Sequence, residues 1–450
     1  MGLREELGGI TAVLDGAAAA YLNDSTEVRG LHGRADAVVL PESAEEVATV
    51  LAWCYEHDVA IVARGGGTGY AGGAVPDGGV VLALERLNRV RSFDPLLWRM
   101  NVEAGVTTGD VRRLAREQGL MFPPDPGGAE QSQIGGNIAT NAGGPHAFKY
   151  GVTGKWVTGV EAAVPPGELI TVGGPTRKDV AGYDLKSLLI GSEGTLGIVT
   201  AAWLRLVPAP EAAFPVAAFY DGIAAGCRAI ERVYGSGLEV AALEYLDGGT
   251  LGATGASFPM GMPAGAGFLV ITEADGSAAE AARLRDETAA VLGEGALSVS
   301  SPSAPEEIAA LWRWRDGVTF AVSAQLGAKL SEDLAVPLDR LEDAIEGTLE
   351  IGRRYDLPAC SWGHAGDGNV HSTFLLAPED PEQLERASRA ADDLLAMALQ
   401  LGGTVSGEHG LGLVRSGWLA RQWGERAVAL HAQIKGVFDP KGLMNPGKKV

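Results

Sequence analysis

The sequence predicts an α+β protein of two or three domains, for three reasons. The chain has 450 residues, more than one hydrophobic core usually holds. Its N-terminal part joins short apolar runs to an amphipathic helix and a glycine-rich loop. Its central part alternates apolar strands with alanine-rich helices, after the two prolines Pro208 and Pro210. The predicted segments are a helical N-terminal segment (1–33), a first domain (34–210), a second domain (211–400) and a C-terminal segment (401–450).

The composition excludes several classes of protein. Apolar residues make up 46% of the chain and charged residues 21%, as in soluble globular proteins. The net charge of −21 argues against nucleic acid as a partner. The three cysteines are far apart and favour a reducing compartment. No apolar run is long enough to form a transmembrane segment, so we expect a cytoplasmic protein, with peripheral membrane association left open.

Each element of the N-terminal part has a local signal. Ser43 and Glu46 form a capping box that begins a helix ending near His57. Another helix begins at Thr108 and is stopped by Gly119. Gly135 and Gly136 begin a short third helix. The apolar runs predict strands at 38–40, 59–63, 80–84, 99–102 and 157–164.

The loop after the strand at 59–63 contains six glycines between Gly65 and Gly73. Bare backbone tolerates positive φ, and a row of free N–H groups can bind pyrophosphate. No Lys-Ser or Lys-Thr follows, which excludes the mononucleotide P-loop. The run from Gly67 to Gly72 matches the dinucleotide pattern, but 72–79 cannot begin the helix that this pattern needs. A glycine-rich hairpin without a ligand remains the alternative.

Further ligand-type stretches follow at 124–126, where Pro-Asp-Pro is rigid, at 134–144 and at 191–197. Together with 64–69 and 149–151, these motifs resemble the FAD domain of the vanillyl-alcohol-oxidase superfamily. Within it, the chain resembles the group of D-lactate dehydrogenase, glycolate oxidase flavin subunit and D-2-hydroxyglutarate dehydrogenase. The resemblance implies a PCMH-type FAD-binding domain of two α/β subdomains, plus a cap domain with an antiparallel sheet and helices.

The resemblance also implies FAD as the cofactor, bound non-covalently because Thr68 stands where relatives with histidyl-linked flavin have His. The tail from Lys435 to Lys448 matches the family's ending, which implies that the C-terminus returns to the FAD domain. The residues implied to contact FAD are Arg64, Gly65, Gly66, Gly67, Thr68, Gly69, Pro124, Asp125, Gly135, Gly136, Asn137, Thr140, Gly143, Gly144, Tyr150, Glu193, Gly194, Ile198 and Asn445.

The stretch 311–320 predicts a helix in which Arg315 and Thr319 are one turn apart. A guanidinium suits a carboxylate, although a solvated Arg beside two tryptophans is the alternative. The resemblance implies that Arg315 and Thr319 contact the substrate carboxylate. The hydroxyglutarate relative adds a Lys at the position of Ser331 here. Lys329 is out of register, so a second carboxylate on the substrate is disfavoured.

Two histidines flank a tight turn at Asp367 and Gly368, and a hairpin there would bring His364 and His371 together. With Glu408, from a loop bracketed by glycines, they form a metal-type set, unless the histidines only bond to backbone. The resemblance implies a divalent metal on His364, His371 and Glu408, with Zn²⁺ or Mn²⁺ favoured. Asn369 would then either support the metal ligands or face the substrate, and His409 would be the general base.

These inferences predict an enzyme that oxidises a D-2-hydroxy acid, of the D-lactate or glycolate type, by hydride transfer to flavin N5 with metal assistance. Alternatives are the flavin subunit of a multi-subunit glycolate oxidase, a D-2-hydroxyglutarate dehydrogenase, a flavin-binding module without catalysis, and an ether-lipid synthase of the same superfamily. The electron acceptor would be a quinone, a cytochrome, an electron-transfer flavoprotein or a partner subunit. A homodimer is compatible with the sequence.

Overall fold

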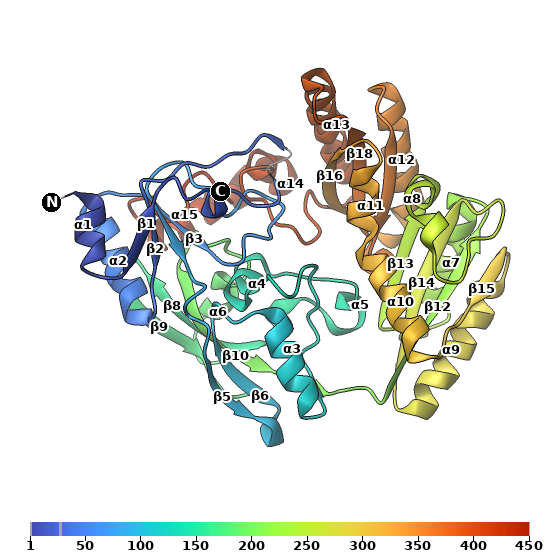
Figure 1. Cartoon of the computed structure of the whole chain (residues 1–450), viewed down its shortest axis with the longest axis horizontal. Coiled ribbons are helices and arrows are strands. Elements are labelled where there is room, and N and C mark those ends of the chain that lie inside the picture. The colour runs from blue at the N-terminus through green and yellow to red at the C-terminus, as the bar shows by residue number, and fades with distance from the viewer. Residues whose placement is uncertain (1, 27–28, 450) are drawn as a thin grey trace. The chain divides into compact units, whose positions relative to one another are not determined.

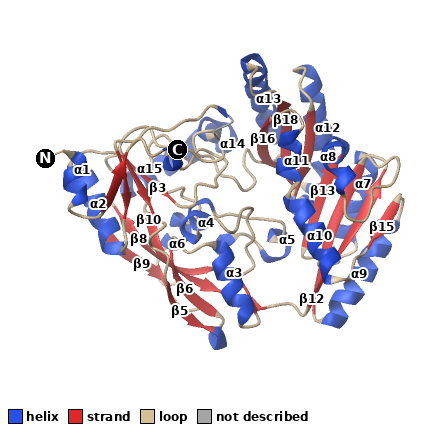
Figure 2. Ribbon diagram, in the orientation of Figure 1, coloured by secondary structure: helices blue, strands red, loops and turns tan. Residues whose placement is uncertain are grey.

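The computed structural model describes residues 2–26 and 29–449. It divides the chain into two compact units (Figure 1). The first unit contains residues 1–144, 151–209 and 408–450, and the second contains residues 145–150 and 210–407. The predicted α+β class is confirmed, because both units pack helices on sheets (Figure 2).

The first unit contains two main sheets. The four-stranded sheet has the order β1 (Ala12–Asp15), β2 (Ala37–Leu40), β4 (Val80–Ala83) and β3 (Ile61–Arg64), in which only β1 is antiparallel to its neighbour. The five-stranded antiparallel sheet has the order β5 (Val90–Asp94), β6 (Arg99–Glu103), β10 (Ile198–Arg205), β8 (Val157–Val164) and β9 (Glu168–Gly173). Helix α2 (Ala44–Glu56) packs Val47, Leu51 and Cys54 into one core shared by both sheets. Ser43 caps this helix as predicted, by accepting from the Glu46 N–H.

Shorter elements complete the first unit. Strands β1 and β5 had no clear signal in the sequence, and β1 lies within the predicted helical segment 1–33. The helices and the remaining small sheet are α1 (Leu3–Gly8), α3 (Thr108–Glu117), α4 (Ile134–Thr140), α6 (Leu185–Leu189), α14 (Leu419–Trp423), α15 (Glu425–Phe438), and β7 (Leu120–Met121) paired with β11 (Val207–Pro208).

The second unit is built on a seven-stranded antiparallel sheet, as expected for a cap domain. Its order is β15 (Ser298–Ser300), β12 (Ala212–Tyr220), β14 (Phe268–Gly276), β13 (Ala242–Asp247), β17 (Ala359–Gly363), β18 (Asn369–Leu376) and β16 (Ala328–Ala335). The helices that pack against it or beside it are α5 (Ala147–Tyr150), α7 (Ile223–Gly235), α8 (Gly248–Thr254), α9 (Ala278–Gly293), α10 (Pro305–Asp316), α11 (Val318–Ala324), α12 (Leu341–Arg354) and α13 (Pro381–Gln400).

The helix predicted over 311–320 is interrupted. Helix α10 ends at Asp316 and α11 begins at Val318, with Gly317 between them. Apolar residues of both helices, including Leu311, Val318 and Val322, pack in one core with residues of the sheet. Arg315 and Thr319 therefore stand on two successive helices. No helix in the described part of the chain combines the length and apolar character needed to span a membrane.

Candidate active site

The glycine loop after β3 packs against the segment that leads into α4. A Cβ on Gly66 would lie 2.0 Å from the carbonyl oxygen of Gln131, so only glycine fits there. Gly67 has φ +69°, which also favours glycine. A Cβ on Gly65 would lie 3.4 Å from Cα of Gly136. The structure thus brings two of the predicted FAD-contacting stretches together in the first unit.

Arg64 has contacts that the sequence did not predict. Its guanidinium donates to the backbone carbonyls of Ala20 (2.8 Å) and Asn23 (2.7 Å). The side chain is buried and fixes the N-terminal segment beside the loop. The free donors that a pyrophosphate would use at this loop are therefore its backbone N–H groups rather than this guanidinium.

Three other predicted stretches meet in the same unit. A Cβ on Gly144 would lie 2.4 Å from the carbonyl oxygen of Asp125, so these two segments touch. The Asn445 amide donates to the carbonyls of Gly73 (2.9 Å) and Glu193 (2.7 Å). The Glu193 carboxylate accepts from the N–H groups of Leu411 (2.9 Å) and Gly412 (2.6 Å). Glu193 and Asn445 thereby tie the C-terminal segment to the glycine loop.

Several predicted FAD contacts make hydrogen bonds within the protein. The Asn137 amide bonds to Ser132 and Thr108, and the Thr140 hydroxyl donates to the Gly136 carbonyl at 3.1 Å. Ile198 begins β10 and is buried in the core. Tyr150 belongs to the second unit, where its hydroxyl donates to Asp275. The others, Thr68, Gly69, Pro124, Gly135, Gly143 and Gly194, lie in the first unit.

The first unit offers polar groups that suit a flavin. Gln133 Oε1 and Asn445 Oδ1 are buried, and neither has a hydrogen-bond partner among residues 2–26 and 29–449. Gln133 Oε1 lies beside the glycine loop, 3.6 Å from where a Cβ on Gly65 would be. Buried acceptors are normally satisfied. A ligand that carries its own N–H donors, such as a flavin ring, fits this part of the unit.

In the second unit, one face of the sheet carries most of the remaining candidates. Asp333, His371, Trp362 and Leu246 are successive cross-strand partners on β16, β18, β17 and β13. Gly368 has φ +65° in the turn between β17 and β18, as the tight-turn signal predicted. The rings of His364 and His371 lie 5.4 Å apart, centroid to centroid, at nearly a right angle. The turn thus brings these two histidines together.

A buried carboxylate, Glu244 on β13, holds two of the predicted residues. It accepts from Arg315 Nε at 2.9 Å and from Arg315 Nη2, and it lies 2.6 Å from His364 Nδ1. Burial alone would raise the pKa of Glu244, but the charges of His364 and Arg315 outweigh burial and hold that pKa at about 2. A carboxylate that holds one ring nitrogen of a histidine is the arrangement typical of metal-bound histidine, and Glu244 holds His364 Nδ1 in this way.

Thr319 has a partner that the sequence did not assign to it. The Lys329 ammonium on β16 donates to the Thr319 hydroxyl and lies 4.7 Å from the centroid of the Trp362 ring. Burial lowers the pKa of Lys329 to about 8. No ion pair between Lys329 and a carboxylate occurs in the described residues. Lys329, excluded above on register, therefore stands next to a predicted substrate-contacting residue.

Asn369 and Asp333 fix the loop that carries the chain to Glu408. Asn369 donates to Asp333 Oδ1 (2.7 Å) and to the Leu334 carbonyl (2.8 Å). Ser406 donates its hydroxyl to Asp333 at 3.1 Å, and the Gly407 N–H donates to the Asp333 carbonyl at 3.3 Å. Glu408 is joined to Gly407 by one peptide bond. Chain connectivity therefore limits how far Glu408 can lie from Asp333.

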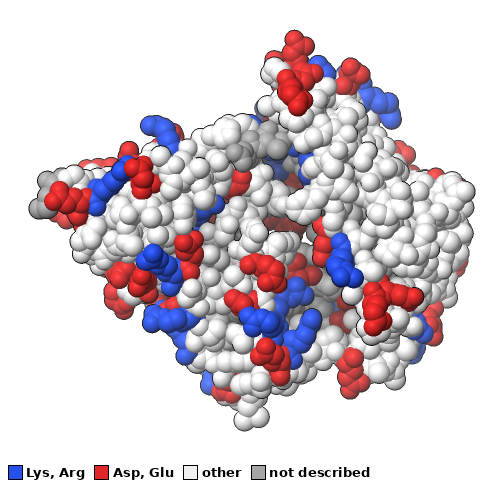
Figure 3. All heavy atoms as spheres, in the orientation of Figure 1, with Lys and Arg blue, Asp and Glu red and all other residues white. Residues whose placement is uncertain are grey.

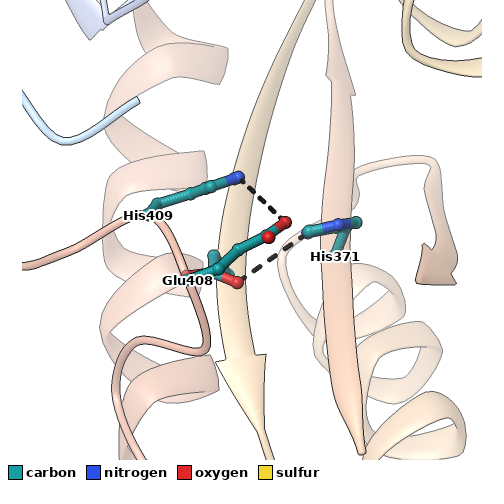
Figure 4. A group of neighbouring side chains, drawn as sticks. His371, Glu408 and His409 are labelled. Carbon is teal, nitrogen blue, oxygen red and sulfur yellow. Dashed lines mark ion pairs between the residues drawn. The ribbon is translucent and has the colours of Figure 1, made fainter. Parts of the chain in front are cut away.

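A group of four side chains could hold a metal ion. Asp333, His371, Glu408 and His409 each offer one ligand atom, and these atoms lie within 4.8 Å of one another. Figure 4 shows His371 with the successive residues Glu408 and His409, whose Nε2 lies 3.9 Å from Glu408 Oε1. The His409 ring also stacks on Tyr70, with centroids 4.8 Å apart. Asp333 takes part in this group, where the sequence predicted His364.

Two functional candidates, Glu244 and Asp333, were missed at the sequence level, and a third, Lys329, was set aside. Glu244 lies in the central strand β13, and Lys329 and Asp333 lie in the edge strand β16. The available signal was the charge itself, because an ionised group in a buried strand needs a partner. Glu244 stands among apolar residues, in Ala-Leu-Glu-Tyr-Leu, and was the easiest of the three to find.

Comparison with known families gives two matches. A model described as "FAD linked oxidases, C-terminal domain" matches residues 209–449, and one described as "FAD binding domain" matches residues 35–173. The two matches follow one another along the chain. The first match alone covers more than half of the sequence.

Relatives with names were found over nearly the whole chain. Glycolate oxidase subunit GlcD of Bacillus subtilis is 36% identical, over 92% of this chain and 88% of that protein. D-2-hydroxyglutarate dehydrogenase of Xanthomonas citri pv. viticola is 37% identical, over 92% and 88%. D-lactate dehydrogenase of Archaeoglobus fulgidus is 34% identical, over 92% and 91%. These three names differ in substrate at similar identities.

Solved structures share the fold at low sequence identity. A p-cresol methylhydroxylase aligns with a TM-score of 0.80 at 16% identity, over 99% of this chain and 95% of that chain. An alkyldihydroxyacetonephosphate synthase aligns with a TM-score of 0.77 at 20% identity, over 98% and 84%. These likenesses support the fold alone.

Proposed function

Since the chain belongs to the family of FAD-linked oxidases, as an oxidoreductase of the D-lactate dehydrogenase and glycolate oxidase group, we propose that it oxidises a D-2-hydroxy acid of the D-lactate or glycolate type to the 2-oxo acid. The observation that carries the proposal is the Glu244 network, which holds an arginine and a histidine on one face of the second unit's sheet. An arginine and a histidine suit a substrate that has a carboxylate beside a hydroxyl.

Arg315 is proposed to hold the substrate carboxylate. Glu244 engages its Nε and Nη2, which leaves Nη1 for the substrate. The same carboxylate orients His364, so the two groups are fixed relative to each other. This preorganisation reduces the cost of positioning the substrate. Thr319 and Asn369 are proposed to complete the substrate contacts.

His409 is proposed to accept the proton of the substrate hydroxyl. Its ring is held by stacking on Tyr70, and an imidazole is a side chain suited to general-base chemistry. His371, Glu408 and either Asp333 or His364 would hold a divalent ion, with Zn²⁺ or Mn²⁺ favoured. A bound ion supplies a Lewis acid that lowers the pKa of a hydroxyl. FAD, bound non-covalently, supplies the hydride acceptor.

Anaerobic reduction of the bound flavin tests the proposal. We expect D-lactate or glycolate to bleach the flavin absorbance, and L-lactate to leave it unchanged. The His409→Ala variant should keep its flavin and lose most of the reduction rate. If no D-2-hydroxy acid bleaches the flavin of the yellow holoprotein, the proposal is wrong. Metal content, measured by elemental analysis, should fall in a His371→Ala variant whatever the activity.

A requirement for partner subunits is a separate outcome. One relative is named as a subunit of glycolate oxidase. If this chain works in the same way, substrate should reduce the flavin, but turnover should need an artificial dye acceptor. Steady turnover with a soluble quinone as acceptor would instead favour a self-sufficient dehydrogenase.

Lys329 favours a second candidate substrate, D-2-hydroxyglutarate or another 2-hydroxy acid with a distal carboxylate. Its ammonium bonds to the hydroxyl of Thr319 and lies over Trp362, whose ring is 6.0 Å from that of His371. The two distances place the ammonium within roughly 11 Å of the His371 ring. With carbon–carbon bonds of about 1.5 Å, a side chain of two or three carbons extends a distal carboxylate by roughly 3–5 Å, so an ion pair needs the ammonium to lie well inside this upper limit. Comparing kcat/KM for D-2-hydroxyglutarate and D-lactate decides between the candidates.

A further inference from the structure

A small pocket in the first unit lies at one end of the five-stranded sheet. It has a volume of about 220 Å³, and its lining includes Leu97, Trp98, Arg99, Thr158, Arg177 and Arg205. No aspartate or glutamate is among its lining residues. Three arginines thus line one cavity in a chain whose net charge is −21.

Two of these arginines face each other across neighbouring strands. Arg99 on β6 is the register partner of Arg205 on β10. Like charges directly opposite each other destabilise a sheet, unless something neutralises them. The carboxylate that pairs with this group is Asp94, 3.3 Å from Arg99 Nη2, and both side chains are partly exposed to solvent. One such pair does not neutralise three guanidinium groups.

Donors of the same two arginines are also unsatisfied. The Nε atoms of Arg99 and Arg205 are buried, and neither has a hydrogen-bond partner within the described ranges. The guanidinium groups instead lie near aromatic rings: Arg205 is 5.2 Å from Trp156, and Arg177 is 5.0 Å from Trp98. A buried N–H without a partner is destabilising. An anion in the pocket would relieve the charge repulsion between the guanidinium groups.

We infer that this pocket binds a phosphate group carried by a small molecule or a lipid headgroup. Arginine forks match the oxygens of a phosphate, and a tetrahedral phosphate can accept from three guanidinium groups where a planar carboxylate offers fewer directions. Leu97, which is 50% exposed, also lines the pocket and offers an apolar surface for the rest of the ligand. Figure 3 shows acidic and basic side chains interspersed over the face in view, so a site with cations alone contrasts with that surface.

Binding experiments on the holoprotein test this inference. Inorganic phosphate, titrated calorimetrically at low salt, should bind and should bind more weakly as ionic strength rises. Arg205→Gln and Arg177→Ala should each weaken binding at least tenfold. Arg177 is exposed in a loop, so its variant tests the site even if Arg205→Gln fails to fold. Arg113→Gln, on the exposed surface of α3, is the matched control and should leave binding unchanged.

Vesicles distinguish the two sources of phosphate. If the site takes a lipid headgroup, the protein should sediment with phosphatidylglycerol vesicles but not with phosphatidylcholine vesicles, and Arg177→Ala should abolish this. Phosphate binding without vesicle binding assigns the site to a soluble phosphate ester. The inference is overturned if neither probe binds, or if Arg113→Gln weakens binding as much as Arg177→Ala. Flavin reduction by hydroxy acids should be the same in all these variants.

Discussion

Two groups of arginines on one face of the five-stranded sheet are neutralised in different ways. Arg89 and Arg91 pair with Glu103, at 2.9 and 3.4 Å, and Arg91 also pairs with Glu161 at 2.9 Å. Arg99 lies four residues before Glu103 on β6, and Arg205 is the register partner of Arg99 on β10. Because side chains alternate along a strand, both arginines share the face of Glu103. Among the described residues, Asp94 is their one carboxylate partner, and it pairs with Arg99. The first group is satisfied within the protein, whereas the second is suited to an outside anion.

The same contrast recurs in the second unit. Arg315 is neutralised by Glu244, whereas Lys329 bonds to a hydroxyl and lies over an aromatic ring. Thr319 lies four residues from Arg315 along the chain, and its hydroxyl bonds to Lys329. Arg315 shares its charge with Glu244 and is proposed to offer only Nη1 to the substrate, whereas the whole charge of Lys329 is left for a ligand. The comparison therefore separates a cation that is fixed by a carboxylate from one that is not.

The largest effect is expected at Glu244. The Glu244→Gln variant should lose about 3–5 kcal/mol of stability, because Arg315 would remain buried without its counter-charge. Urea unfolding followed by circular dichroism measures this loss, and the exposed Glu287→Gln should change stability by less than about 0.5 kcal/mol. Because the pKa of Glu244 is lowered from 4.5 to about 2, its contribution is present above pH 4.5 and is lost as pH falls through 2. Equal midpoints for the two variants would contradict a structural role.

The next effect concerns the paired group on the five-stranded sheet. Glu103 is 1% exposed, so Glu103→Gln should cost about 1–3 kcal/mol by weakening bonds to Arg89 and Arg91. Asp94→Asn, in the second group, should cost at most about 1 kcal/mol, since both members of the Asp94–Arg99 pair are partly exposed. Thermal unfolding of both variants gives the comparison. A larger loss for Asp94→Asn would show that the two groups are not distinguished by pairing.

A smaller effect, on specificity, is expected at Lys329. Lys329→Met keeps the length of the side chain and removes the charge. If a distal carboxylate binds there, kcat/KM for D-2-hydroxyglutarate should fall about tenfold to a hundredfold, while the value for D-lactate should stay within twofold. Ser331→Ala, two residues along β16, is the control, because its hydroxyl bonds to Thr373. An unchanged ratio of the two substrates would leave the Arg315 role intact and remove the second candidate.

The smallest effect is a pH dependence of the same ratio. Burial holds the pKa of Lys329 at about 8, below its usual 10.5, so the free enzyme loses this positive charge as pH rises through 8. The preference for a dicarboxylate over a monocarboxylate should therefore decline above pH 8, by up to tenfold per pH unit. Steady-state rates between pH 7 and 10 with both substrates measure it. A ratio that does not change with pH would show that Lys329 does not face the distal group.

Local signals in the sequence were enough for many elements but not for all. The Ser43 cap and the turn at Gly368 depend on a few neighbouring residues, and both were predicted. The break at Gly317 was missed, because a glycine inside a helical pattern is often tolerated and only packing decides the outcome. Strand β1 was missed because its pairing partner, β2, lies more than twenty residues further on.

The candidate site was predictable where residues come from one hairpin and unpredictable where they come from distant strands. His364 and His371 are separated by a single turn. Glu244, by contrast, is 120 residues from His364 and 71 from Arg315, so no spacing connects them. Lys329 was excluded on register, yet its long side chain reaches Thr319. Matching positions along the sequence compares where the backbone of a residue lies. The ammonium of lysine stands at the end of a flexible four-carbon side chain, so it can reach groups well away from that backbone position.

The return of the C-terminal segment to the glycine loop has a consequence for biosynthesis. The Ile61 N–H donates to the Leu443 carbonyl, and the Asn445 N–H donates to the Ile61 carbonyl. A ribosome adding about 5–20 residues per second needs roughly 20–80 s to travel from one partner to the other. During that time the nascent loop lacks these two partners, so flavin should be captured only after residues 443–445 have been synthesised. Polypeptides truncated before residue 443 should then be colourless.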